Sequence, residues 1–279
     1  MGYICIMIKS MFKNNSRTLV NIIGVPLLLS SIYFGEFLFT TLIYFSIFVC
    51  IHELYKICLK LEINLQFFWL YFFSILLYLT HFFDIQELII LDDMQLFSLV
   101  CILIIITEFF LGEKNKIQNI SATIFSIIWL IVFLNFIVQI RYDYGFEITL
   151  LMFLSVWICD TFAFVIGSKF GKKKIFPKIS PNKTWMGTIA GYICSIIFVF
   201  FILQYRLVNI DFSYFNVFII GSIFGCIGQI GDALESLIKR YANIKDSGKI
   251  LRGHGGMLDR LDSLILSAPC FYIFLSLFA

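Results

Sequence analysis

Long runs of apolar residues alternate with short polar stretches along the chain of 279 residues. A helix needs about 20 apolar residues to cross a bilayer, and by this criterion the pattern predicts about nine membrane-spanning helices. Their predicted ranges are Leu19–Tyr33, Leu38–Cys58, Phe67–Phe83, Leu96–Leu111, Ile120–Ile140, Ile148–Gly167, Thr184–Gln204, Phe215–Leu237 and Leu261–Ala279. We therefore expect an all-α, polytopic integral membrane protein, whose functional site is built from helix ends and short loops.

The composition supports this fold class and excludes others. Hydrophobic residues make up 60% of the chain and charged residues only 14%, whereas a soluble domain has about 25% charged residues. The polar residues are too few to cover a water-exposed surface, and the same figures exclude disorder, collagen-like repeats and coiled coil. The eight cysteines are scattered without a CxxC pair, so we expect buried thiols and no disulfide framework.

The basic residues predict how the chain is oriented. With nine crossings, all of them except Arg141 and Arg206 fall on the side that holds the N-terminus and the loops after the even-numbered helices. Short cytoplasmic loops collect Lys and Arg, so the basic side is predicted to face the cytoplasm. Minimal loops and the lack of a transit peptide favour the cytoplasmic (inner) membrane of a prokaryotic cell.

Two loops on the basic side carry candidate chemistry. The first, Ser168–Lys183, contains six lysines and no acidic residue. It is either a topology anchor that touches anionic headgroups or part of a phosphate site. The second interpretation rests on donors that lie where a helix is predicted to start, because helix N-termini bind phosphate. These donors are Ser180, Asn182, Lys183 and Thr184.

The second region, Gly231–Asp262, begins with four polar residues on one face of a predicted helix: Asp232, Glu235, Ser236 and Lys239. A carboxylate inside a membrane costs about 2.5–3.5 kcal/mol, which makes such residues functional candidates. Carboxylates, bases and two glycines follow: Lys245, Asp246, Lys249, Arg252, His254, Gly255, Gly256, Asp259, Arg260 and Asp262. This mixture fits a site for Mg²⁺ and phosphate. A structural ion-pair loop is the alternative, and zinc is not favoured because His254 lacks a partner at ligand spacing.

Two other acidic residues end predicted helices. Asp160 closes the sixth helix beside the lysine-rich loop and is a further candidate for the site. Glu108 closes the fourth helix, and we expect it to be an interfacial carboxylate that pairs with Lys114 and Lys116.

The motifs of the C-terminal half resemble those of the phosphatidate cytidylyltransferases (CDP-diacylglycerol synthases). The resemblance rests on DTFAFVIG from Asp160, SPNKTW from Ser180, the Gly231-Asp232 pair, and then SLIKR, KDSG and HGGMLDRLD between Ser236 and Asp262. Accordingly, residues 1–147 are interpreted as N-terminal transmembrane helices and residues 148–279 as the catalytic region. Three positions depart from the family pattern: Met186 replaces a usual Glu, Arg252 a usual Pro and Phe164 a usual Tyr.

The resemblance implies that CTP and phosphatidate react to give CDP-diacylglycerol and pyrophosphate, with Mg²⁺ as cofactor and a monovalent cation such as K⁺ able to share the site. It assigns Asp232 and Asp259 to the metal. The catalytic residues that it implies are Asp232, Lys239, Asp246, Asp259 and Arg260. The substrate-binding residues are Ser180, Lys183, Thr184, Ser236, Arg240, Lys245, His254, Gly255 and Gly256. It also implies a homodimer in the lipid bilayer and no nucleic-acid partner.

Three alternatives stay open. A CTP-dependent polyprenol or dolichol kinase would release CDP in place of pyrophosphate, and a related synthase would use another lipid phosphate. A transporter or scaffold is disfavoured because the polar residues gather at one membrane interface, whereas a transport path would place them near the bilayer midplane.

Overall fold

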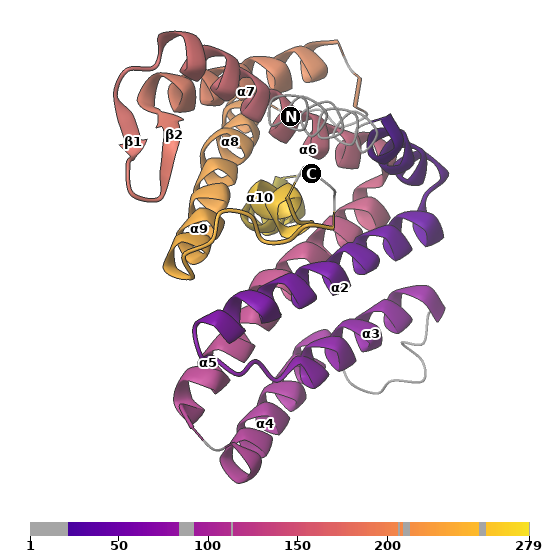
Figure 1. Ribbon diagram of the computed structural model, residues 1–279. Helices are drawn as coiled ribbons and strands as arrows, with labels where there is room; N and C mark the ends of the chain where they lie inside the picture. The colour runs from indigo at the N-terminus through magenta and orange to yellow at the C-terminus, as the bar shows by residue number, and fades with distance from the viewer. Residues whose placement is uncertain are drawn as a thin grey trace, which may run out of the picture.

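The computed structural model describes residues 22–83, 92–112, 114–205, 207–208, 213–250 and 255–278. This part of the chain is a bundle of helices with one short hairpin (Figure 1). The elements are a helix Ile22–Phe34, α2 (Glu36–Lys60), α3 (Phe67–Phe83), α4 (Asp93–Leu111), α5 (Lys116–Ser126), η2 (Ile127–Val132), α6 (Phe133–Phe170), β1 (Lys174–Phe176), β2 (Ser180–Thr184), α7 (Trp185–Gln204), α8 (Tyr214–Ser222), η3 (Ile223–Ile227), α9 (Gly228–Tyr241) and α10 (Leu258–Phe278).

The prediction of an all-α membrane protein is confirmed, with one addition. Within the described residues, six helices are long and apolar enough to cross a membrane. Each predicted range overlaps a helical segment, although residues 19–21 and Ala279 lie outside the described part. The lysine-rich loop, predicted without strands, contains the antiparallel pair β1 and β2.

The fifth and sixth predicted spans lie in one helical run of 55 residues, Lys116–Phe170. The run bends at Gly145, whose φ of 79° is readily adopted only without a Cβ. The predicted boundary between the two regions, after residue 147, therefore falls inside α6, just beyond this bend. The number of nine crossings stays a prediction.

Side-chain caps explain where several helices begin. Asp92 Oδ1 accepts a hydrogen bond from the backbone N–H of Gln95 at 2.7 Å, and Gln95 Oε1 accepts one from the backbone N–H of Asp92 at 3.1 Å. This capping box starts α4. The Thr184 hydroxyl accepts from Gly187 N at 3.2 Å and starts α7. The cap therefore fixes the junction between the hairpin and the next helix.

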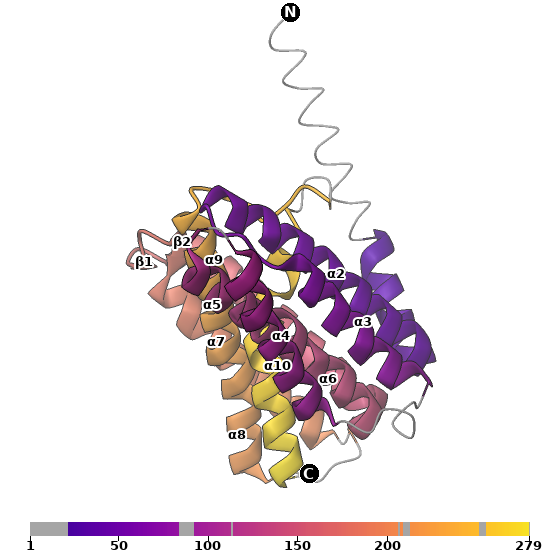
Figure 2. The same ribbon diagram turned by 90° about the horizontal axis from the view of Figure 1, so that it is seen from below.

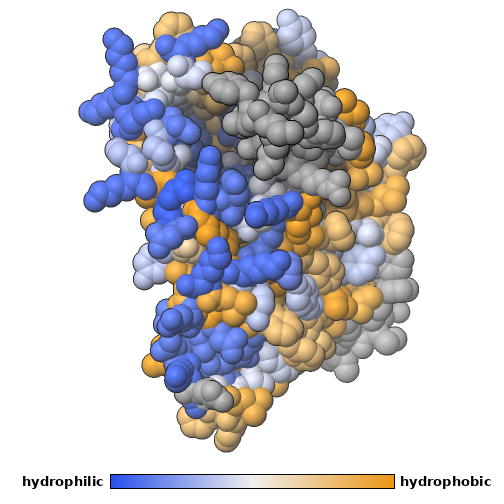
Figure 3. All heavy atoms as spheres, viewed as in Figure 1, coloured by the Kyte–Doolittle hydropathy of each residue, from blue (hydrophilic) through white to orange (hydrophobic). Residues whose placement is uncertain are grey.

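The helices place the polar elements at one end of the molecule. α10 packs against α9, α6 and α2, and Figure 1 shows α10 between α2 and the group of α7, α8 and α9. Figure 2 shows the hairpin, α9 and α5 at the same end. In Figure 3, hydrophilic side chains gather along this edge, whereas orange, hydrophobic side chains cover much of the remaining visible surface. The visible surface therefore combines an apolar area suited to lipid with one polar edge.

Candidate active site

Three carboxylates converge where α9 packs against α10. Asp232 and Glu235 lie one turn apart on α9, Asp262 lies near the start of α10, and one oxygen of each lies within 4.8 Å of the others. Glu235 is 0% exposed, and its Oε1 atom has no hydrogen-bond partner among the described residues. A buried carboxylate oxygen without a donor is costly. The cluster therefore fits a cation that takes oxygen ligands, such as Mg²⁺.

Lys239 joins this cluster to the loop before α10. Its Nζ atom lies 2.5 Å from Glu235 Oε2 and 2.5 Å from Asp259 Oδ1. The second oxygen of Asp259 accepts hydrogen bonds from Gly256 N at 2.7 Å and from the backbone and hydroxyl of Ser247 at 3.0 Å. Protein donors therefore occupy both oxygens of Asp259. The cluster with the unpartnered oxygen of Glu235 consists of Asp232, Glu235 and Asp262, and Asp259 is not part of it.

Glu53, on α2, is a buried residue of the site that the sequence analysis missed. It is 1% exposed. Its carboxylate accepts from Ser247 Oγ at 3.0 Å, from Met257 N at 3.1 Å and from Leu258 N at 2.9 Å. It thus holds the first residues of α10, where the helix dipole favours an anion. An acidic residue inside the apolar run Leu38–Cys58 was the signal that could have revealed it.

Two basic residues attach the hairpin to α9. Lys183, on β2, forms an ion pair with Asp232 at 2.7 Å. Arg240 donates from Nε to the carbonyl of Ile179 at 3.0 Å and from a terminal nitrogen to that of Ile244 at 2.7 Å. The predicted sites on the hairpin and on α9 are therefore brought together, with Arg240 acting as a brace.

Two cavities meet at Lys183. One, of about 480 Å³, is lined by Asp160, Asp232 and the start of α7. The other, of about 290 Å³, is mainly apolar and includes Ile189 and Tyr192. Lys183, Thr188 and Gln229 line both. A cavity with charged lining residues and a mainly apolar cavity thus adjoin beside the carboxylate cluster.

The structure separates the other predicted residues into buried and exposed groups. Ser236 is buried and donates to Asp232 Oδ1 at 3.3 Å, and Thr184 is buried as a helix cap. Ser180 is half-buried at the start of β2. The exposed residues are Lys245, Asp246 and Arg260.

The structure describes the two glycines of the turn before α10 and two of the three positions that depart from the family pattern. Gly255, with a φ of 84°, and Gly256 approach Asp259 so closely that a side chain on Gly255 would collide with its carboxylate. His254 and Arg252 lie outside the described residues. Met186 is exposed, and Phe164 is exposed and lines the 480 Å³ cavity.

The predicted pairing of Glu108 with Lys114 and Lys116 is wrong. Glu108 is buried and accepts hydrogen bonds from Gln66 Nε2 at 2.8 Å and Asn119 Nδ2 at 2.7 Å. Lys116 donates to a backbone carbonyl of α4 instead. The two amides reach the carboxylate because α3 and α5 pack close to the end of α4.

Comparison with known proteins gives consistent matches. The sequence model of the Cytidylyltransferase family matches residues 15–278. A protein of Staphylococcus saprophyticus, named phosphatidate cytidylyltransferase, is 37% identical over 186 residues, which cover 66% of this chain and 70% of the relative. A protein of Staphylococcus haemolyticus with the same name is 36% identical with the same coverage. A third of that name, from Thermotoga maritima, is 38% identical over 162 residues, or 56% of this chain and 59% of the relative.

Proposed function

This chain belongs to the cytidylyltransferase family, and we propose that it transfers the cytidylyl group of CTP to phosphatidate, giving CDP-diacylglycerol and pyrophosphate. The observation that carries this proposal is that a cavity with charged lining residues and a mainly apolar cavity meet at Lys183, beside three carboxylates. Such a junction suits one water-soluble substrate and one lipid. The names of the relatives support the same reaction.

The carboxylate cluster would hold Mg²⁺ through Asp232, Glu235 and Asp262. The unpartnered Oε1 atom of Glu235 supports this assignment, because Mg²⁺ prefers oxygen ligands and commonly shares them with substrate phosphates. A bound Mg²⁺ would supply positive charge to the reacting phosphates. A monovalent cation such as K⁺ can share this site. That Asp259 itself binds metal stays a prediction, and its contacts support a positioning role through Lys239.

The reaction itself needs little covalent help from the protein. A phosphate oxygen of phosphatidate forms a bond to the α-phosphorus of CTP, the bond between the α- and β-phosphates breaks, and pyrophosphate leaves. Since the attacking oxygen is already anionic, no strong base is required. Lys183, at the junction of the cavities, would hold the lipid phosphate, and the exposed Lys245 and Arg260 would meet the phosphates of CTP.

The site would face the cytoplasm from a multi-pass position in the inner membrane. This placement is supported by the asymmetry of the basic residues and by the gathering of polar side chains at the end that carries α9 and the hairpin. CTP would arrive from water, and the acyl chains would stay in the bilayer. The implied homodimer stays a prediction.

The test uses membranes that contain the protein, supplied with phosphatidate, Mg²⁺ and CTP labelled in the cytosine ring. We expect label in the organic phase, its loss with EDTA, and less of it in Asp262→Asn at the Mg²⁺ concentration that saturates the wild type. Asp93→Asn, at the far end of α4, is the matched control and should keep full transfer. Release of CDP without labelled lipid would instead identify a lipid kinase. No transfer by folded protein would contradict the proposal, unless Met186→Glu restores it.

A further inference from the structure

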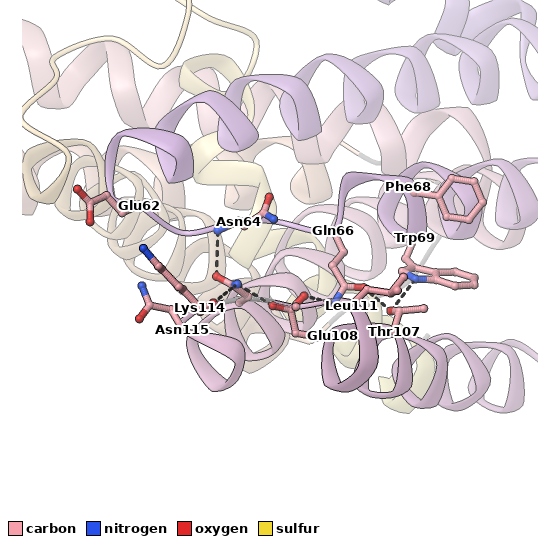
Figure 4. Close-up of a pocket in the computed structure, with 12 residues that line it drawn as sticks. Glu62, Asn64, Gln66, Phe68, Trp69, Thr107, Glu108, Leu111, Lys114 and Asn115 are labelled. Carbon is pink, nitrogen blue, oxygen red and sulfur yellow. Dashed lines mark hydrogen bonds between the residues drawn. The ribbon is translucent and has the colours of Figure 1, made fainter.

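A separate pocket of about 790 Å³ lies in the N-terminal half of the protein. Its walls come from the connection between α2 and α3, the last turns of α4 and the beginning of α5, and Figure 4 shows its lining residues. None of the carboxylates of the candidate active site lines it. The proposed reaction therefore leaves this pocket without a role.

Hydrogen bonds hold the interior wall of the pocket in place. Glu108 accepts from the amides of Gln66 and Asn119, and Gln66 Oε1 accepts from Thr107 Oγ1 at 2.7 Å. Thr107 in turn accepts from Trp69 Nε1 at 3.1 Å. Because the side chains are tied to one another across three helices, the pocket has a preformed polar wall, as ligand sites commonly do.

The two ends of the pocket differ in character. Figure 4 shows Glu62, Lys114 and Asn115 at one end and Phe68 and Trp69 at the other. Glu62 and Lys114 are both exposed, and neither forms an ion pair among the described residues. Phe68 is also exposed and lies in the first turn of α3. The charged end therefore offers one positive and one negative group, and the aromatic end lies along the apolar helices.

We propose that this pocket binds a phospholipid whose headgroup carries both a phosphate and a primary ammonium. Lys114 would receive the phosphate and Glu62 the ammonium, and the exposed side-chain amide of Asn115, which lines the same end of the pocket, would donate to an ester oxygen. The acyl chain would pass Phe68 and Leu111, both of which are exposed lining residues. Trp is common where the apolar and polar surroundings of a membrane protein meet, and Trp69 lies at the aromatic end of this pocket.

Two features favour a lipid of zwitterionic character over a soluble anion or an anionic lipid. Glu62 lies at the charged end and Glu108 in the wall, and these two carboxylates would repel a ligand with only negative charge. The aromatic end would be left unfilled by a small soluble phosphate. A lipid whose headgroup carries both charges would match the charged end of the pocket, and its acyl chain would fill the aromatic end.

The pocket lies at the same end of the helix bundle as the candidate active site. α2 carries Glu53 at that site and ends at Lys60, two residues before Glu62 at the pocket. Figure 2 likewise places α5 at the end that holds α9 and the hairpin. Lipid recognition here uses no residue assigned to cytidylyl transfer, so either proposal can fail without the other.

The test measures which lipids stay bound to the purified protein. The full chain is equilibrated in detergent with equal amounts of ethanolamine, choline and glycerol phospholipids that have identical acyl chains, and native mass spectrometry counts the retained lipids. We expect the ethanolamine lipid to be enriched. In the double variant Glu62→Gln, Lys114→Gln its retention should fall by about tenfold, the effect of losing roughly 1.4 kcal/mol of binding free energy.

The matched control is Asp93→Asn, on the same helix as Glu108 but outside the pocket, and it should retain the ethanolamine lipid as wild type does. Equal retention of all three lipids, preference for the glycerol lipid, or unchanged binding in the double variant would overturn the proposal. If the double variant does not fold, an ethanolamine lipid with a photoreactive acyl chain is cross-linked to the wild-type protein. Labelling must then reach the segments around Phe68 and Leu111, and labelling elsewhere refutes the site.

Discussion

Glu53→Ala should be among the most damaging single substitutions in this protein, although Glu53 lies far from the catalytic motifs in the sequence. The carboxylate accepts from the backbone N–H groups of Met257 and Leu258 and from the Ser247 hydroxyl. Ser247 can keep its second acceptor, Asp259 Oδ2, at 3.0 Å. Two backbone donors lose their acceptor: that of Leu258 is buried and that of Met257 is partly buried.

An orphaned buried donor costs about 1–3 kcal/mol. Two donors therefore predict a loss of about 2–6 kcal/mol for Glu53→Ala, with a further loss because the anion at the start of α10 disappears. Glu53→Gln keeps the shape and one acceptor oxygen, so its loss should be about 1–3 kcal/mol. The free energy of unfolding should therefore be lowest for Glu53→Ala, intermediate for Glu53→Gln and highest for the wild type.

The free energy of unfolding is measured by denaturant titration in detergent, and cytidylyl transfer is measured on the same samples. His52→Ala, on the exposed face of the same helix, is the control and should change the unfolding free energy by no more than about 0.5 kcal/mol. If Glu53→Ala has the same free energy of unfolding as His52→Ala and keeps its rate of cytidylyl transfer, the conclusion that Glu53 stabilises the start of α10 is refuted.

Four further substitutions test the active site and the packing of the glycine turn beside it. Lys183→Ala, which removes the charged side chain among those that line both cavities, should lower labelled-lipid formation on the order of a hundredfold, and unchanged turnover would contradict its role. Asp262→Asn should raise the Mg²⁺ concentration needed for half-maximal rate by about tenfold or more. Asp259→Asn should lower the rate, because Lys239 loses its charged partner, without changing the Mg²⁺ concentration needed for half-maximal rate. If instead Asp259→Asn changes that concentration and Asp262→Asn does not, Asp259 is the metal ligand and Asp262 the positioning residue. Gly256→Ala, whose methyl group would overlap neighbouring side chains, should cost about 1–3 kcal/mol of stability, and a melting temperature equal to that of wild type would argue against such close packing.

The sequence predicts the long helices well because each contains a long apolar stretch, which suits both lipid and the packed interior of the bundle. The face of α9 that carries Glu235 and Lys239 is equally visible, since helical spacing alone aligns these residues. Gly145 could not be identified as a bend inside one helical run, because a glycine between two spans is equally compatible with a loop.

Contacts between distant segments limit what the sequence can predict about the site. Glu53 and Leu258 are 205 positions apart, and no local pattern links them. Whether Asp259 or Asp262 binds the metal likewise depends on which of the two carboxylates accepts the backbone hydrogen bond from the glycine turn, and the sequence does not show this. The strands of the hairpin were missed because a lysine-rich segment of that length predicts a loop.

The contact between Glu53 and the start of α10 also constrains the order of assembly during biosynthesis. The ribosome must add 205 residues after Glu53 before its partner Leu258 exists, which takes roughly 10–40 s at about 5–20 residues per second. Throughout that interval, α2 carries a carboxylate without the donors that satisfy it in the finished protein. Until then, the Glu53 carboxylate would need hydrogen bonds from water or from the insertion machinery. Insertion of the last helix would then complete the bundle and the catalytic centre together.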